Sequence, residues 1–161
     1  MDETTFGFDE LELGQSWESA ARLVTQDDVT AFGDLTGDRN PIHMDPEYAR
    51  KTPYRRPVAH GLLGVGIAAG LMLSVSRVKM IAFLEIRRWE FLLPIFPGDR
   101  IRTVTTVQAK EPRGRGRRGE VVWQLSILNQ DDQVVQRSET VTLVGAAARA
   151  VLCTTSPFSE T

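Results

Sequence analysis

Asp38 and His43 lie five residues apart, within residues 36–43 (Thr-Gly-Asp-Arg-Asn-Pro-Ile-His). This spacing does not place two side chains on one face of a helix, where neighbours are three or four residues apart. In a loop, Pro41 fixes its own φ and keeps Asn40 out of the helical region, so the chain can curl until both side chains face one point. A carboxylate and an imidazole that hold one water molecule form an acid–base pair near neutral pH. The alternative is structural, with Asp38 as a turn residue and His43 as a surface histidine before a helix.

A second candidate lies at residues 55–61 (Arg-Arg-Pro-Val-Ala-His-Gly). Pro57 suits the first position of a helix, which would leave the backbone N–H groups near His60 and Gly61 without partners inside the helix. A glycine lets a ligand oxygen approach its amide, and the helix dipole favours negative charge there, as an enolate or oxyanion requires. The alternative is that Gly61 only relieves crowding against a strand.

The elements that position these residues follow from hydropathy and turn signals. Residues 57–76 contain no Asp, Glu, Lys or Arg. This stretch is long enough for a transmembrane helix, but His60 and the many Gly and Ala residues favour a fully buried core helix. Thr25 predicts the cap of a short earlier helix, and Asp45 with Pro46 predicts another. Strands are expected at 14–25, 81–91, 100–109, 120–129 and 134–144, with a basic connection at 113–119 and a turn at 131–132.

These elements predict an α+β fold in which an antiparallel sheet wraps a long central helix. The 161 residues, of which 42% are hydrophobic and 25% charged, are expected to form one domain with a core of about 14–146 and a tail at 147–161. Cys153 is the single cysteine, so no intramolecular disulfide is possible. This and the absence of a signal-peptide pattern in residues 1–12 predict a cytoplasmic protein.

Charge is unevenly distributed along the chain. Residues 1–50 contain 3 Arg and 12 Asp or Glu, whereas residues 51–130 contain 14 Lys or Arg and 5 acidic residues. Neither the net charge of −2 nor the short Arg-rich segment at 113–118 predicts a nucleic-acid partner. This segment, or Arg55 and Arg56, can instead contact an anionic ligand such as a phosphate.

The chain resembles the MaoC-like, (R)-specific enoyl-CoA hydratase (hydratase 2) family of hot-dog-fold proteins. The resemblance rests on residues 32–43 (Phe-Gly-Asp-Leu-Thr-Gly-Asp-Arg-Asn-Pro-Ile-His) and 57–61, and extends through 89–91, Pro94 and 97–99. It covers about residues 14–146. The Asp-x-Asn-Pro-aliphatic-His motif is far more specific than an isolated Asp–His pair.

The resemblance implies reversible addition of water to 2-enoyl thioesters of coenzyme A or acyl carrier protein, giving (R)-3-hydroxyacyl thioesters. Asp38 and His43 would activate the water, and the Gly61 amide would bind the thioester carbonyl. Asn40 would shape the loop, and His60 would support the start of the helix. Members of the family are usually dimers joined at the sheet edges, with the pantetheine arm near the interface. No cofactor, membrane or nucleic-acid partner is expected.

Two other function classes remain open. The first is a hot-dog thioesterase, although many of these carry an acidic residue on the central helix and residues 57–76 have none. The second is a non-catalytic acyl-thioester-binding subunit, which would tolerate loss of the Asp38–His43 pair. His43 with Asp45 resembles part of a metal site, but two histidines and no cysteine cluster do not predict one. Residues 64–70 approach a dinucleotide fingerprint without the strand that must precede it.

Overall fold

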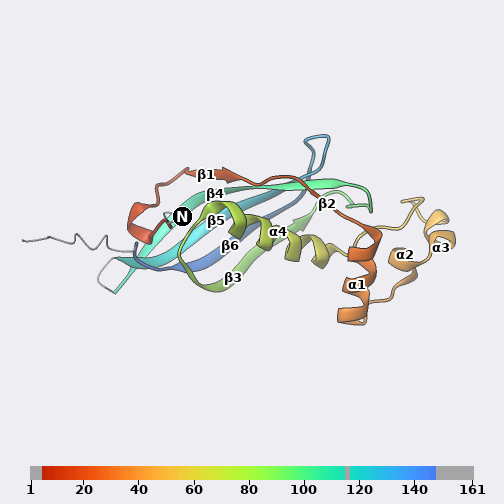
Figure 1. The fold of residues 1–161 in the computed structure, drawn as a ribbon, viewed down its shortest axis with the longest axis horizontal. Coiled ribbons are helices and arrows are strands. Elements are labelled where there is room, and N and C mark those ends of the chain that lie inside the picture. The colour runs from red at the N-terminus through yellow and green to blue at the C-terminus, as the bar shows by residue number, and fades with distance from the viewer. Residues whose placement is uncertain (1–4, 115–116, 148–161) are drawn as a thin grey trace, which may run out of the picture.

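The computed structural model describes residues 5–114 and 117–147. Its sheet is antiparallel, with strands in the order β1-β4-β5-β6-β3 and β2 also paired to β4. Figure 1 shows this sheet as one long curved layer. The strands are β1 (Ser16–Glu18), β2 (Arg22–Leu23), β3 (Met80–Phe91), β4 (Arg100–Arg113), β5 (Arg118–Leu128) and β6 (Val134–Val144).

The four long strands β3, β4, β5 and β6 confirm the predicted series. Two other details differ from the prediction. Strands β4 and β5 extend into the expected 113–119 connection, because Arg113 pairs with Arg118. The predicted strand at 14–25 is interrupted at residues 19–21. There the Ser19 N–H still donates to the Thr103 carbonyl, but the buried Ser19 hydroxyl accepts from the Thr103 N–H in place of a backbone carbonyl. Residues 115–116 of the basic segment, Cys153 and nearly all of the expected tail lie outside the described residues.

Helix α4 (Gly61–Ser76) lies along the sheet and is the predicted central helix (Figure 1). Its buried residues recur every four positions, at Gly64, Ala68, Met72 and Ser76, which places one stripe against the sheet. The expectation of a fully buried helix is wrong, since Leu62 is 65% exposed. The sheet of one chain covers only one side of α4.

The start of α4 also differs from the prediction. Pro57 is not the first helical residue, because α4 begins at Gly61. The backbone N–H of Val58 donates to the Ile42 carbonyl at 3.2 Å, and that of Ala59 donates to the Ile95 carbonyl at 2.8 Å. These bonds hold residues 58–59 extended, so the helix starts after them.

The short helices gather at one end of the sheet (Figure 1). Helix α1 (Gln26–Thr36) begins at the predicted cap, where the Thr25 side chain accepts from the Asp28 N–H and the Asp28 carboxylate accepts from the Thr25 N–H. Helix α3 (Pro46–Arg50) has Asp45 as its N-cap residue, as predicted. Between them lies a helix that was not predicted, α2 (Pro41–Met44).

Two clusters of buried apolar residues form the core. The larger one joins α1 and α4 to the sheet through residues such as Val29, Ala68 and Leu125. The smaller one covers the other end of the sheet and includes Phe8 in the 3-10 helix η1 (Phe8–Glu10) and Trp123. The core therefore includes residues before position 14. Among the helices of the described residues, none is both long and apolar enough to cross a membrane.

Candidate active site

Asp38 lies directly after the end of α1. Gly37 ends the helix in the left-handed conformation, with φ of 79°, and its N–H donates to the Gly33 carbonyl at 2.9 Å. The Asp38 carboxylate accepts a hydrogen bond from the backbone N–H of Asn40 at 3.3 Å. The Asp38 side chain is 52% exposed, so the carboxylate keeps room for a water molecule.

His43 lies on the one-turn helix α2 and not in an open loop as expected. The Asn40 side chain caps this helix by accepting from the Ile42 N–H at 3.1 Å, and Pro41 occupies its first position. Asn40 thus shapes the segment as predicted, by starting a helix. A hydrogen bond orients the His43 ring, since its Nδ1 lies 2.7 Å from the Val58 carbonyl oxygen.

The Val58 contact determines the tautomer of His43. A carbonyl oxygen can only accept, so Nδ1 of a neutral His43 carries the hydrogen and donates it to Val58. The Nε2 atom then holds the lone pair. A neutral imidazole held in this way presents a base that can accept a proton from water.

His60 lies between the two candidate residues. Its Nε2 is 2.8 Å from the backbone carbonyl oxygen of Asp38 and 4.0 Å from the Asp38 carboxylate. Its ring is 3% exposed and packs against the rings of His43 and Phe32, with centroid distances of 3.9 and 5.0 Å. His60 is therefore the N-cap residue of α4 and a direct support of both Asp38 and His43.

The structure brings together the three groups that the sequence singled out. A ring nitrogen of His43, one of His60 and a carboxylate oxygen of Asp38 all lie within 4.8 Å of one another. Two atoms that each bond one water molecule at about 2.8 Å stand about 4.6 Å apart. The upper limit of 4.8 Å is compatible with one water molecule between the Asp38 carboxylate and a ring nitrogen of His43.

These three groups also have the residue types of a metal site. His43 Nδ1 and His60 Nε2 are bonded to backbone carbonyl oxygens, which leaves His43 Nε2 and His60 Nδ1 as the ring nitrogens that could ligate an ion. The two rings stack at an interplanar angle of 31°, whereas ligands of one ion point their nitrogens at a common centre. The stacking of the two rings therefore argues against both histidines ligating one ion.

Gly61 is the first residue of α4, where the sequence analysis placed an unpaired amide. Among the described residues, no group accepts a hydrogen bond from the backbone N–H of Gly61 or of Leu62. Gly61 lines a pocket of about 240 Å³ together with Tyr54, Phe91 and Gln136. Gly61 therefore lies at the wall of a space that a ligand can enter, and Asp38 and His43 are not among the residues that line it.

The structure supports the alternative interpretation of Gly61, that it relieves crowding against a strand. A Cβ on Gly61 would lie 2.8 Å from the edge of the Phe91 ring, which is closer than such atoms approach. Strand β3 therefore packs against the helix start where the side chain is missing. The same glycine allows this packing and leaves its amide accessible.

Three further residues of the site were missed by the sequence analysis. Val58 orients His43 through its carbonyl oxygen. Trp89 and the buried Gln136 form a hydrogen-bonded pair beneath Gly61. Gln136 stands among other polar residues in the strand at 134–144, so no sequence signal distinguishes it.

A small apolar cavity of about 50 Å³ lies between α4 and the sheet. Ala69, Met72 and Leu73 of α4 line it. Gly66 and Leu71 line a separate groove on another face of the helix, beside Phe32. The remaining residues around the cavity are Val65, Met80, Phe83, Trp89, Leu125 and Thr140.

Known proteins resemble this chain in sequence. The sequence model of the MaoC like domain matches residues 10–126. The chain is 32% identical over 109 residues to the 3-hydroxyacyl-thioester dehydratase Z of Mycobacterium tuberculosis, covering 65% of this chain and 70% of that protein. It is 34% identical over 99 residues to the (R)-specific enoyl-CoA hydratase of Aeromonas caviae, covering 62% and 72%.

Solved structures show the same fold. The monoamine oxidase regulatory protein of Archaeoglobus superposes with a TM-score of 0.82 at 30% identity, covering 92% of this chain and 99% of that one. A Mycobacterium tuberculosis protein described as a double hot-dog fold superposes with a TM-score of 0.77 at 20% identity, covering 98% of this chain and 46% of that one. The fold is a hot-dog fold of the α+β class, and the chain belongs to the MaoC-like dehydratase domain family.

Proposed function

We propose that this protein reversibly adds water to trans-2-enoyl thioesters and forms (R)-3-hydroxyacyl thioesters. The observation that carries the proposal is the contact of His60 with both Asp38 and His43, at the residue that directly precedes the unpaired amide of Gly61. One of the two relatives is named a dehydratase and the other a hydratase, which supports both removal and addition of water.

In this mechanism, Asp38 and His43 hold the water and His43 Nε2 accepts one of its protons. The water oxygen bonds to C3 of the enoyl group as the C2–C3 double bond opens. The negative charge moves to the thioester oxygen, where the N–H of Gly61 and the positive end of α4 stabilise the enolate. A proton returned by the acid–base pair then bonds to C2, which completes the addition.

The acyl chain is proposed to follow α4 from Gly61 toward the apolar cavity lined by Ala69 and Met72. These residues lie eight and eleven positions beyond Gly61, or about 12 and 16 Å along the helix axis. The cavity walls are apolar side chains, as a fatty acyl chain requires.

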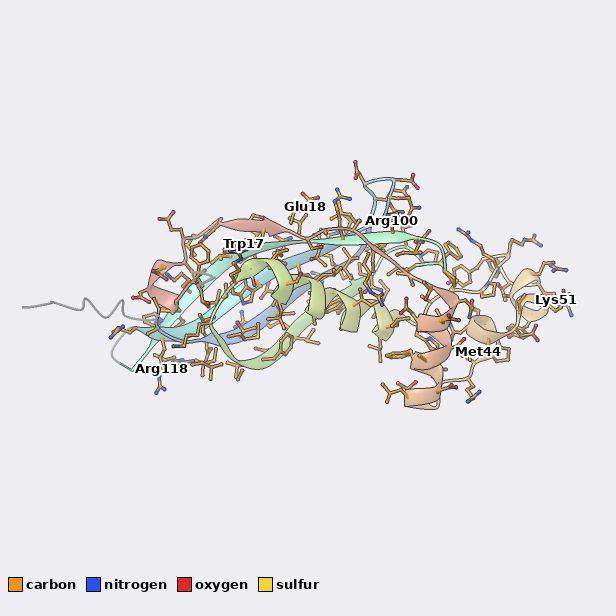
Figure 2. All side chains as sticks on the ribbon, in the orientation of Figure 1. Trp17, Glu18, Met44, Lys51, Arg100 and Arg118 are labelled. Atoms are coloured by element: carbon orange, nitrogen blue, oxygen red, sulfur yellow. The ribbon has the colours of Figure 1, made fainter. Side chains whose placement is uncertain are left out.

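The thioester carrier is proposed to be coenzyme A or acyl carrier protein, whose phosphate would meet a basic side chain. Figure 2 shows Arg118 at the end of the molecule opposite Met44 and Lys51, which mark the end with the short helices. Arg118 lies beside the end of β6 at Val144, whereas Gly61 contacts Gln136 near the start of that strand, so within one chain Arg118 is remote from Gly61. Arg55 and Arg56 are close to the pocket in sequence and space, since the neighbouring Tyr54 lines it, so they are the better candidates for the phosphate.

The protein is also proposed to form a homodimer through β3. Within the described residues this strand pairs only with β6, so its other edge has unpaired backbone groups. Phe83, Leu84 and Ile86 on this strand are each between 47% and 48% exposed. Antiparallel pairing of β3 with the same strand of a second copy would cover this edge by a two-fold axis.

The proposed activity is tested with crotonyl-CoA, by following the loss of absorbance of the conjugated thioester and analysing the chirality of the product. Hydration predicts conversion to (R)-3-hydroxybutyryl-CoA without release of free thiol. Release of free coenzyme A, detected with a thiol reagent, would instead identify a thioesterase. Binding of the thioester without turnover would identify a non-catalytic subunit.

A further inference from the structure

Gln136 is a buried polar residue on β6 that contacts the start of α4. It is 2% exposed, and its Nε2 lies 3.3 Å from the Gly61 carbonyl oxygen. Its Oε1 lies 3.0 Å from the indole Nε1 of Trp89 on β3. One side chain thus connects two neighbouring strands to the first residue of the helix.

The indole of Trp89 determines which way the Gln136 amide points. An indole N–H can only donate, so the oxygen of Gln136 must face Trp89. The NH₂ group of Gln136 then faces Gly61, whose carbonyl oxygen can only accept. Both polar ends of the side chain are used. The opposite orientation would place the NH₂ group against the Trp89 N–H and the amide oxygen against the Gly61 carbonyl oxygen.

Helix α4 comes close enough for this contact because Gly64 has no side chain. A Cβ at position 64 would lie 2.6 Å from Gln136 Nε2. Gly64 is buried and faces the sheet one turn after Gly61. The close approach of helix and strand therefore positions the Gln136 amide under the first turn.

We propose that Gln136, oriented by Trp89, is a positioning residue that fixes the direction of the free N–H groups at the start of α4. Gly61 has the widest backbone freedom of any residue type, and no side chain limits its rotation. A hydrogen bond to its carbonyl holds the peptide plane between Gly61 and Leu62, and with it the direction of the Leu62 N–H. The proposal rests on the proposed role of the Gly61 amide in binding the thioester oxygen.

The test replaces the pair by apolar residues of similar shape, in the double variant Trp89→Phe with Gln136→Met. This removes both hydrogen-bonding partners without leaving one of them unpaired in the core. The matched control is Trp123→Phe with Thr142→Val. That pair is also buried and is joined by an indole hydrogen bond of 2.8 Å, but it does not line the pocket.

Two readouts separate positioning from general destabilisation. We expect kcat for crotonyl-CoA to fall about tenfold in the Trp89–Gln136 variant while the control pair stays within about twofold of wild type. In an Asp38→Asn background, bound 2,4-hexadienoyl-CoA should absorb at longer wavelength when its carbonyl accepts a hydrogen bond. This red shift should shrink in the Trp89–Gln136 variant and persist in the control.

A Trp89–Gln136 variant with unchanged kcat and red shift would overturn the proposal, as would an equal loss in both pairs. If the double variant does not fold, Gln136→Glu serves instead. Its ionised carboxylate still accepts from Trp89 but faces the Gly61 carbonyl with an acceptor, so kcat should fall as pH rises relative to wild type. A pH profile equal to that of wild type would contradict the proposal. Lack of hydration by the wild-type protein would instead refute the proposed function itself.

Discussion

The imidazole rings of His43 and His60 stack with centroids 3.9 Å apart and planes 31° from parallel. His60 also donates its Nε2 hydrogen to the Asp38 backbone carbonyl at 2.8 Å. The residue that caps α4 therefore orders both members of the acid–base pair. This arrangement connects the helix start, which binds the substrate oxygen in the proposed mechanism, with the residues that hold water.

This relationship predicts the behaviour of two His60 variants. In His60→Phe, the ring stacked on His43 is kept but the bond to the Asp38 carbonyl is lost, so we expect kcat to fall about tenfold. In His60→Ala, both contacts are lost and the fall should be larger. Steady-state kinetics with crotonyl-CoA measure both. Equal activity of His60→Phe and wild type would show that the Asp38 contact has no part in positioning.

Gly61→Ala is expected to lower kcat by at least about tenfold, because the new methyl group meets the Phe91 ring at 2.8 Å and crowds the amide. The matched control is Gly70→Ala in the same helix, where a Cβ has no neighbour within 4 Å. This control should gain up to about 1 kcal/mol of stability from helix propensity and keep its activity. Unchanged kinetics of Gly61→Ala would contradict the assignment of its amide.

Asp28 at the start of α1 predicts a pH-dependent contribution to stability. Burial opposes ionisation of Asp28, but the Thr25 backbone N–H, the Arg22 guanidinium and the Thr25 hydroxyl bond its carboxylate and together hold its pKa below the usual range. A folded-state pKa below the unfolded one stabilises the protein at neutral pH, and this stabilisation is lost as pH falls through the folded-state value.

Asp28→Asn should therefore lower the free energy of unfolding by about 1–2 kcal/mol at pH 7, with a smaller difference from wild type below about pH 4. Urea unfolding at both pH values measures the difference. Asp27→Asn is the control, since Asp27 is an exposed neighbour in the same first turn. A difference between Asp28→Asn and wild type that did not change with pH would refute the predicted contribution of ionised Asp28.

The free edge of β3 predicts the outcome of Ile86→Lys. A lysine at this exposed position of the unpaired strand should disfavour pairing with a second copy and shift the protein toward the mass of a single chain. Sedimentation or light scattering after gel filtration measures this mass. Leu13→Lys, at an exposed apolar residue outside the strands, should leave it unchanged. A wild-type protein that is already a single chain would exclude the dimer.

Local patterns predicted most of the fold. The long apolar stretch became α4, the caps at Thr25 and Asp45 were confirmed, and the four long strands lie where alternation and turns indicated. Helix α2 was missed because four residues contain too little periodicity to detect. The exposed face of α4 was missed because an all-apolar helix carries no signal for which side the sheet covers.

The candidate site was predictable only where it is local. Asp38, Asn40 and His43 share one short motif, so their proximity follows from the sequence alone. The bond from His60 to Asp38 spans 22 residues, and that from Gln136 to Gly61 spans 75. Such contacts depend on how the sheet packs against the helix, so no local pattern contains them.

The most direct test of the central claim is the turnover of crotonyl-CoA by Asp38→Asn and His43→Gln. Each substitution keeps the size of the side chain while removing its ability to exchange a proton with water. We expect kcat to fall about 10²–10⁴-fold in both variants, with melting temperatures near that of wild type. Asp45→Asn, which retains a capping side chain outside the site, should keep its activity. Near-normal hydration by both Asp38→Asn and His43→Gln would contradict the proposed mechanism.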